Sequence, residues 1–188
     1  MEVAKGTFRN RVLQWYYSSE HHSLIAFSNS EFYQVDLVVF PAPYAEGAEF
    51  GIRRSFIEGA QYQASRNPAE ARVVAEAVRD HIIQRRYGSI GIATFNTSQR
   101  DLILEEIERL QKQDPRLDQM LRDQDAESNE PLFVKNLENV QGDERDVIFI
   151  STTYGPDADT GRAYQRFGPL AGDHGWRRLN VILTRARR

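Results

Sequence analysis

Residues 177–188 read RRLNVILTRARR and carry five arginines with no acidic residue. Arg178 and Arg185 are seven residues apart, which on a helix places them on one face about 10 Å from each other. A solvated basic helix is one interpretation, but arginine in place of lysine favours bidentate contacts to phosphate or carboxylate groups. The apolar residues recur at helical spacing and predict a buried stripe beneath the basic face. This stripe consists of Leu179, Ile182, Leu183 and Ala186.

The composition is that of a globular protein without a general affinity for polyanions. The chain has 188 residues, 40% hydrophobic and 27% charged, which suits one domain with an ample core. Its net charge is −3, so any binding of nucleic acid must come from local patches. The absence of cysteine excludes disulfides and thiolate metal sites and fits a cytoplasmic location. No apolar run has membrane-spanning length, so no membrane association is expected.

Strands and helices alternate along the chain. The apolar runs lack a polar alternation, which favours a mainly parallel sheet flanked by helices, an α/β fold. The helix after Asn67-Pro68 and the helix after Asn96 both begin with an N-cap signal. Residues 101–130 contain ten acids and four bases, a pattern typical of a solvated outer face and a mobile connection. We expect strands at 35–40, 50–57, 89–95, 132–135 and 147–152, helices at 20–27, 67–87, 97–110 and 177–188, and a long loop at 154–175.

Two regions of this fold are candidates for binding. Ligands of parallel sheets sit at the carboxyl ends of the strands, which here carry Thr94, Asn96 and Thr152. The segment 139–150, NVQGDERDVIFI, places four charged residues next to a buried strand. Within it, Gly142 allows a close approach of the backbone to a ligand, and the Glu144 carboxylate can accept hydrogen bonds from a ribose. A polar turn before a strand explains the same segment equally well.

Several kinds of catalytic site have no signal in the sequence. There is no G-x-x-x-x-G-K-[ST] and hence no P-loop, and no strand ends in an Asp-Glu pair suited to Mg²⁺. Adjacent His21 and His22 would face different ways on a helix, and no further ligand stands at metal-binding spacing, so we expect no metal site. The chain by itself is therefore not expected to hydrolyse a nucleotide, and a stand-alone nucleoside-phosphate enzyme is a poor interpretation.

Taken together, these motifs resemble one family. The run QGDERD before an apolar strand, followed by RRLNVILTRAR, resembles motifs V and VI of superfamily 1 helicases, most closely the Upf/Dna/Nam-like group. Residues 90–100 and 13–33 resemble earlier segments of that family in the same order. The segment NVQGDERDVIFIS is most similar to the corresponding segment of large bacterial multidomain helicase-like proteins. The resemblance covers the chain from about residue 13 to residue 188.

The resemblance implies that residues 1–188 form one C-terminal RecA-like domain, a fragment of a longer protein. In this family the P-loop and the Mg²⁺-binding acids belong to the first RecA-like domain, and the second domain closes over ATP. Partners would be that first domain of the same polypeptide and single-stranded DNA or RNA. Residues 1–12 are expected to be flexible or to form the edge of the fragment.

The resemblance also implies roles for individual nucleotide-binding residues. Arg185 matches the motif VI arginine that reaches the γ-phosphate, and Arg178 is a second catalytic candidate. Tyr17 matches a tyrosine that packs against adenine. Gln141, Gly142 and Glu144 match the motif V turn at the nucleotide. Arg100, in the first turn of a helix, opposes the helix dipole and should therefore have an anionic partner, either a carboxylate or a phosphate.

The strand ends are the expected contacts to a single strand, where Thr94, Asn96 and Thr152 can bind phosphates. One departure stands out, because Tyr17-Ser18 replaces the Tyr-Arg that the family usually carries, and that arginine is a second γ-phosphate contact. Either another arginine such as Arg178 or Arg100 takes over, or the parent hydrolyses ATP slowly. The alternative function is a catalytically degenerate module that binds nucleic acid or protein.

Overall fold

The structure is a computed structural model that describes residues 15–16, 19–34, 36–42, 50–84, 88–164, 167–173 and 175–188. The expected flexible segment 1–12 lies outside the described residues, and so do Tyr17 and Ser18.

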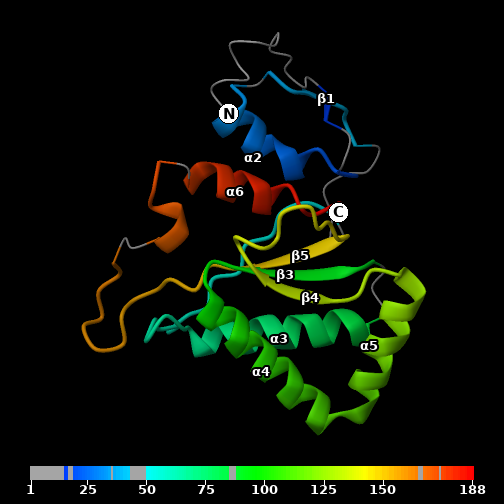
Figure 1. Ribbon diagram of the computed structural model, residues 1–188, viewed down its shortest axis with the longest axis vertical. Coiled ribbons are helices and arrows are strands. Elements are labelled where there is room, and N and C mark those ends of the chain that lie inside the picture. Colours follow the sequence, from blue (N-terminus) through cyan, green and yellow to red (C-terminus); the bar gives the residue numbers. More distant parts are fainter. Residues whose placement is uncertain are drawn as a thin grey trace.

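A parallel three-stranded sheet forms the centre of the molecule (Figure 1). Its strands are β3 (Ile90–Thr94), β4 (Phe133–Asn136) and β5 (Val147–Ser151), in the order β4-β3-β5. Ile90 pairs with Val147 on one side of β3, and Gly91 pairs with Phe133 on the other. Every residue of the central strand β3 is buried, as an apolar run without alternation predicts. The expected α/β fold with a parallel sheet flanked by helices, consistent with a RecA-like domain, is confirmed.

The helices α3 (Pro68–Ile83) and α4 (Thr97–Gln113) cover one face of the sheet, and α5 (Pro115–Ser128) packs against both of them. The expected caps are present, because the Asn67 side chain accepts from the Glu70 amide and the Asn96 side chain accepts from the Gln99 amide. The expected mobile connection within 101–130 is wrong. Asp114 and Pro115 instead start the separate helix α5, which buries Leu117 and Leu121 against the same core.

The other face is covered by α6 (Gly175–Leu183), with the 3₁₀ turn η1 (Gly168–Leu170) leading into it. Ile182 is fully buried against β3 and β5 neighbours, and Leu179 and Leu183 pack beside it. The helix α2 (Ser23–Phe32) lies on the outer side of α6, so that α6 stands between α2 and the sheet (Figure 1). The helix α2 begins at Ser23, later than the expected residue 20, after His22 as its N-cap.

A second, very small parallel sheet pairs β1 (Trp15–Tyr16) with β2 (Val38–Val39). The expected buried strand at 35–40 is thus reduced to two residues, and Val38 is 46% exposed. The Asn29 side chain provides the reason, because it bonds both the amide and the carbonyl of Leu37 at 3.1 Å. Those two groups are no longer available to a strand ladder. Between residues 50 and 57, all of them described, there is no strand.

The end of the chain differs most from the expectation. The helix α6 stops at Leu183, Thr184 and Arg185 form a turn, and residues 186–188 run on as an extended segment rather than as helix. Ala186 therefore does not belong to the apolar stripe, and Arg185 does not share a helix face with Arg178. Among the described helices, none is both long and apolar enough to cross a bilayer.

Candidate functional site

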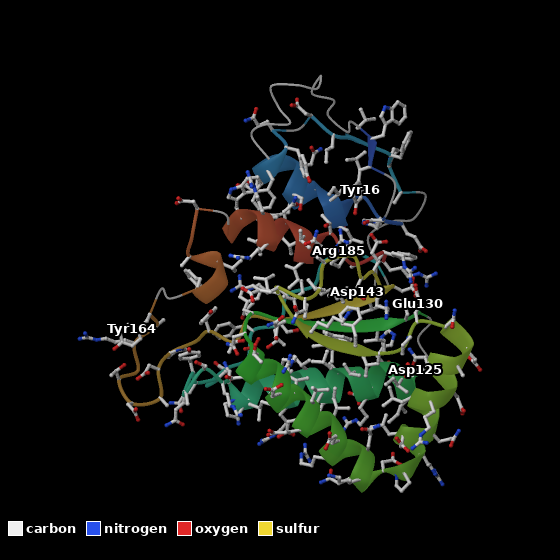
Figure 2. All side chains as sticks on the ribbon, viewed as in Figure 1. Tyr16, Asp125, Glu130, Asp143, Tyr164 and Arg185 are labelled. Carbon is white, nitrogen blue, oxygen red and sulfur yellow. The ribbon has the colours of Figure 1, made fainter. Side chains whose placement is uncertain are left out.

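The extended end of the chain lies alongside the segment that leads into β5. Ala186 forms a parallel bridge with Arg145, and backbone hydrogen bonds join Arg145 N to Arg185 O (3.2 Å) and Arg187 N to Arg145 O (2.9 Å). The two segments that resemble motifs V and VI, about forty residues apart in the chain, therefore run side by side. Figure 2 shows Arg185 where α6 ends, with Asp143 and Tyr16 nearby.

This pairing brings together two of the expected site residues, Glu144 and Arg185. Arg185 Nη1 lies 3.7 Å from Glu144 Oε1, a loose ion pair. The rest of the guanidinium is held locally, since Nε donates to the Val181 carbonyl (3.0 Å) and Nη2 donates to Thr184 Oγ1 (3.2 Å). Its side chain is 19% exposed. Arg185 is thus directed from the helix end toward Glu144 by contacts within its own segment.

Tyr16 lies at the same place and was not expected in the site. Its hydroxyl shares a hydrogen bond with Ser19 Oγ (2.8 Å), and Ser19 donates to the Ala186 carbonyl (3.2 Å). Burial raises the pKa of the Tyr16 hydroxyl, the Ser19 bond opposes that rise, and the Glu144 charge adds to it. The signal in the sequence was the position next to Tyr17, the residue expected to pack against adenine.

Arg178 and Gln141 meet in a separate open pocket of about 290 Å³. Leu137, Glu138, Arg177 and Val181 complete its lining. Gly142 adjoins this turn with φ +89°, and a Cβ there would meet no atom within 4 Å. The backbone at Gly142 is therefore open to an approaching ligand, as the sequence suggested, although its left-handed φ alone also accounts for the glycine.

The expected single-strand contacts divide into two kinds. Thr94 is buried and its hydroxyl donates to the Asn96 carbonyl (2.8 Å), while the Asn96 side chain caps α4. Both side chains therefore have structural bonds. Thr152, directly after β5, is exposed. Arg100 has the anionic partner that its position required, and that partner is a carboxylate: Nη2 lies 2.6 Å from Asp101 Oδ1.

The two groups of candidates lie at opposite ends of the sheet. Thr94 and Thr152 stand at the carboxyl ends of β3 and β5, whereas Glu144 and Arg185 lie beside the start of β5. The rule that ligands bind at carboxyl ends therefore located only the first group. The motif resemblance located the second.

Sequence reasoning missed two polar clusters. One is buried beneath the carboxyl ends: Gln99 bonds the Asn67 amide (2.8 Å), the Asn67 carbonyl (3.2 Å) and Ser151 Oγ (3.2 Å). The other lies at the amino ends of the strands and surrounds Arg187. Isolated polar residues next to strands carry no periodic signal, so neither cluster was visible in the sequence. Within the described part of the chain, no three acidic or histidine side chains gather as metal ligands.

Comparison with known proteins identifies a matching family and similar proteins named as helicases. The AAA domain family matches residues 50–188. A Mycoplasma genitalium protein named uncharacterized ATP-dependent helicase MG140 is 36% identical over 178 residues, which cover 94% of this chain and 15% of that protein. Its Mycoplasma pneumoniae homologue is 35% identical over 179 residues, with the same coverage of both chains. The chain thus spans about 15% of the length of the curated relatives it matches.

Proposed function

Because this chain belongs to the AAA domain family, we propose that it is the second RecA-like domain of an ATP-dependent superfamily 1 helicase, of the Upf/Dna/Nam-like group. The names of the Mycoplasma relatives support the helicase activity, and their much greater length supports a large bacterial parent. The parent moves along single-stranded DNA or RNA as its two RecA-like domains close and open around ATP.

The pairing of Arg185 with Glu144 carries this proposal. The chain has no P-loop, so ATP is bound by the first domain, which also holds the Mg²⁺ that the resemblance implies. The carboxylate that Arg185 faces among the described residues, Glu144, is 3.7 Å away, so a phosphate can replace it at small cost. A guanidinium supplied across the domain boundary stabilises the charge on the transferring phosphoryl group.

Other residues have supporting parts in this proposal. Glu144 is released when Arg185 turns to phosphate, and its carboxylate then accepts from a ribose hydroxyl. Tyr17 packs against the adenine, while Arg178 and Gln141 contact phosphate or an acid of the first domain. Thr152 is the exposed residue at the carboxyl ends and contacts the single strand. Thr94 and Asn96 shape that edge, and Arg100 exchanges Asp101 for a phosphate when the strand or nucleotide binds.

The test is Arg185→Ala in the complete polypeptide that contains this chain. We expect kcat for ATP to fall by about 10³-fold or more, as in other arginine-finger enzymes, while the affinity for a single strand is retained. Arg122→Ala is the matched control, because Arg122 forms an exposed ion pair with Asp118 on α5, away from the site. Turnover that survives in Arg185→Ala together with a loss of single-strand binding would contradict the arginine-finger role.

Tyr17-Ser18 supports a second candidate, a degenerate module that binds nucleic acid or protein without hydrolysis. The sequence of the first domain distinguishes the two. An intact G-x-x-x-x-G-K-[ST] and an Asp-Glu strand end support the motor, and their loss supports the degenerate module.

A further inference from the structure

Arg187 stands two residues after Arg185 and has very different surroundings. Its guanidinium binds groups that precede all three strands of the central sheet. Nη1 donates to Glu130 Oε1 (3.1 Å) and Nη2 to Glu130 Oε2, before β4. Nη2 also donates to Ser89 Oγ (3.0 Å), before β3, and Nε lies 3.1 Å from Asp146 Oδ1, before β5. A planar guanidinium can meet three such partners at once, which an ammonium cannot do in this fork geometry.

The partners of Arg187 are also bound to one another. The Ser89 hydroxyl donates to Glu130 Oε2 (2.5 Å), and the Ser89 amide donates to Asp146 Oδ2 (2.8 Å). Gly88 allows this close approach, since a Cβ there would lie 2.5 Å from the Asp146 Cβ. The hydrogen bond from Arg187 holds the pKa of Glu130 below its ordinary value, and the Glu130 bond raises the pKa of Arg187. We call these four residues, Ser89, Glu130, Asp146 and Arg187, the amino-edge cluster.

The amino-edge cluster and the Arg185 site are in register with each other. The bridge between Arg145 and Ala186 is parallel, so Glu144 stands opposite Arg185 on one side of it and Asp146 stands opposite Arg187 on the other. Both opposing pairs are ion pairs, at 3.7 Å and 3.1 Å. The Asp146–Arg187 pair is reinforced by Glu130 and Ser89, whereas the other bonds of the Arg185 guanidinium to described residues go to the uncharged Val181 carbonyl and Thr184 hydroxyl.

We propose that Arg187 is the positioning residue that fixes Arg185 for phosphate binding. The amino-edge cluster holds residues 185–188 against the amino ends of all three strands. The Arg185 guanidinium therefore has one defined position before phosphate binds, while its ion pair with Glu144 remains weak enough to be replaced. Arg187 needs no contact with the nucleotide for this role. The inference rests on the proposed function for its catalytic consequence, but the positioning itself is a property of this chain.

The experiment therefore has a spectroscopic arm that needs no ATP. In the ¹⁵N-labelled chain, the Nε–Hε cross-peak of Arg185, assigned by its loss in Arg185→Lys, should stand apart from those of exposed arginines because Nε is bonded to Val181 O. In Arg187→Lys the Arg185 cross-peak should move to the chemical shifts of the exposed arginines, and its Hε proton should exchange with water at the rate of theirs. Arg122→Lys, the same substitution in an exposed ion pair, should leave it unchanged. Glu130→Gln removes one partner only and should shift it partway, which covers the case that Arg187→Lys does not fold.

The kinetic arm uses the complete polypeptide. Arg187→Lys should lower kcat by about 10²-fold, the scale of a misplaced catalytic group, with KM for ATP unchanged. An Arg185 cross-peak that stays in place in both Arg187→Lys and Glu130→Gln would overturn the inference. If Arg185→Ala does not slow ATP turnover, the proposed function fails, while the spectroscopic arm still decides whether Arg187 positions Arg185.

Discussion

Two arginines at the end of this chain differ in how strongly acidic groups hold them. Arg185 faces one carboxylate at 3.7 Å, and Arg187 faces Glu130 and Asp146 together with a serine. An isolated, partly exposed ion pair contributes little, roughly 0–1 kcal/mol, and is lost easily. A cluster with several charge-assisted bonds is retained because each bond keeps the others aligned. The difference matches the roles that we propose for the two residues.

Glu130 makes the stability of the folded protein depend on pH. Its pKa is lowered in the folded protein, chiefly by the hydrogen bond from Arg187, so its contribution to stability is present above 4.5, the ordinary value, and is lost as pH falls through the lower folded pKa. Glu130→Gln should therefore reduce the loss of unfolding free energy between neutral pH and pH values below 4.5. Urea unfolding at neutral pH and at a pH below 4.5 measures this loss of unfolding free energy. The exposed Glu105→Gln on α4 is the control and should keep the wild-type difference, and equal acid sensitivity of wild type and Glu130→Gln would refute the assignment.

At the scale of the elements, capping and apolar runs were predictable from sequence because their signals are local. Asn67, Asn96 and the run of β3 each formed the element that their pattern indicated. The end of α6 was not predictable, because Leu183 to Arg188 has helical periodicity but gains backbone partners from Arg145 and Asp146 by leaving the helix. The sequence also could not show that Asn29 occupies the backbone of Leu37 and shortens β2. In both cases a distant partner overrides a local preference.

The candidate site follows the same division. The motif resemblance selected Glu144 and Arg185, which the structure brings together, although Arg185 lies in the turn after α6 and not on a helix face. The resemblance did not select Arg187, Glu130 or Ser89. Their association depends on the strand order β4-β3-β5, which places the amino ends of the three strands side by side. A single sequence contains no record of that order.

Gln99 ties α4 to the start of α3 and to β5. It is fully buried and makes three hydrogen bonds to Asn67 and Ser151, and Ser151 in turn donates to Glu70 (3.1 Å). Gln99→Ala should destabilise the protein by about 2–3 kcal/mol, because buried polar partners lose their bonds. Thermal or urea unfolding measures the change. Gln119→Ala on the exposed side of α5 should be nearly neutral, and equal stability of the two variants would show that the network is not needed.

Gly175 allows the start of α6 to pack closely against the 3₁₀ turn η1. A Cβ at this buried first residue would lie 1.9 Å from the Leu170 carbonyl oxygen, a backbone atom that cannot yield as a side chain can. Gly175→Ala should cost about 1–3 kcal/mol of stability by overpacking the turn between η1 and α6. Gly172→Ala, where a Cβ meets nothing within 4 Å, is the matched control for unfolding measurements. A loss confined to Gly172→Ala, or absent from both, would contradict this account of the turn.

At the scale of the whole molecule, the two faces of the sheet are covered by different helices, and the proposed site lies on one side. The helices α3, α4 and α5 close one face with an aliphatic core, while α6, with α2 on its outer side, covers the other and leads the chain end toward the start of β5 (Figure 1). Arg185 emerges there, in a chain that has no P-loop of its own. The central claim is therefore that this domain contributes one half of an ATPase site and that a first RecA-like domain contributes the other.

ATP turnover by the purified 188-residue chain, measured beside the complete polypeptide with and without single-stranded nucleic acid, tests that claim most directly. We expect no turnover by the chain alone under any of these conditions, and we expect turnover by the complete polypeptide that a single strand stimulates and Arg185→Ala abolishes. Steady ATP hydrolysis by the purified chain alone, at a rate comparable to that of the complete polypeptide, would contradict it.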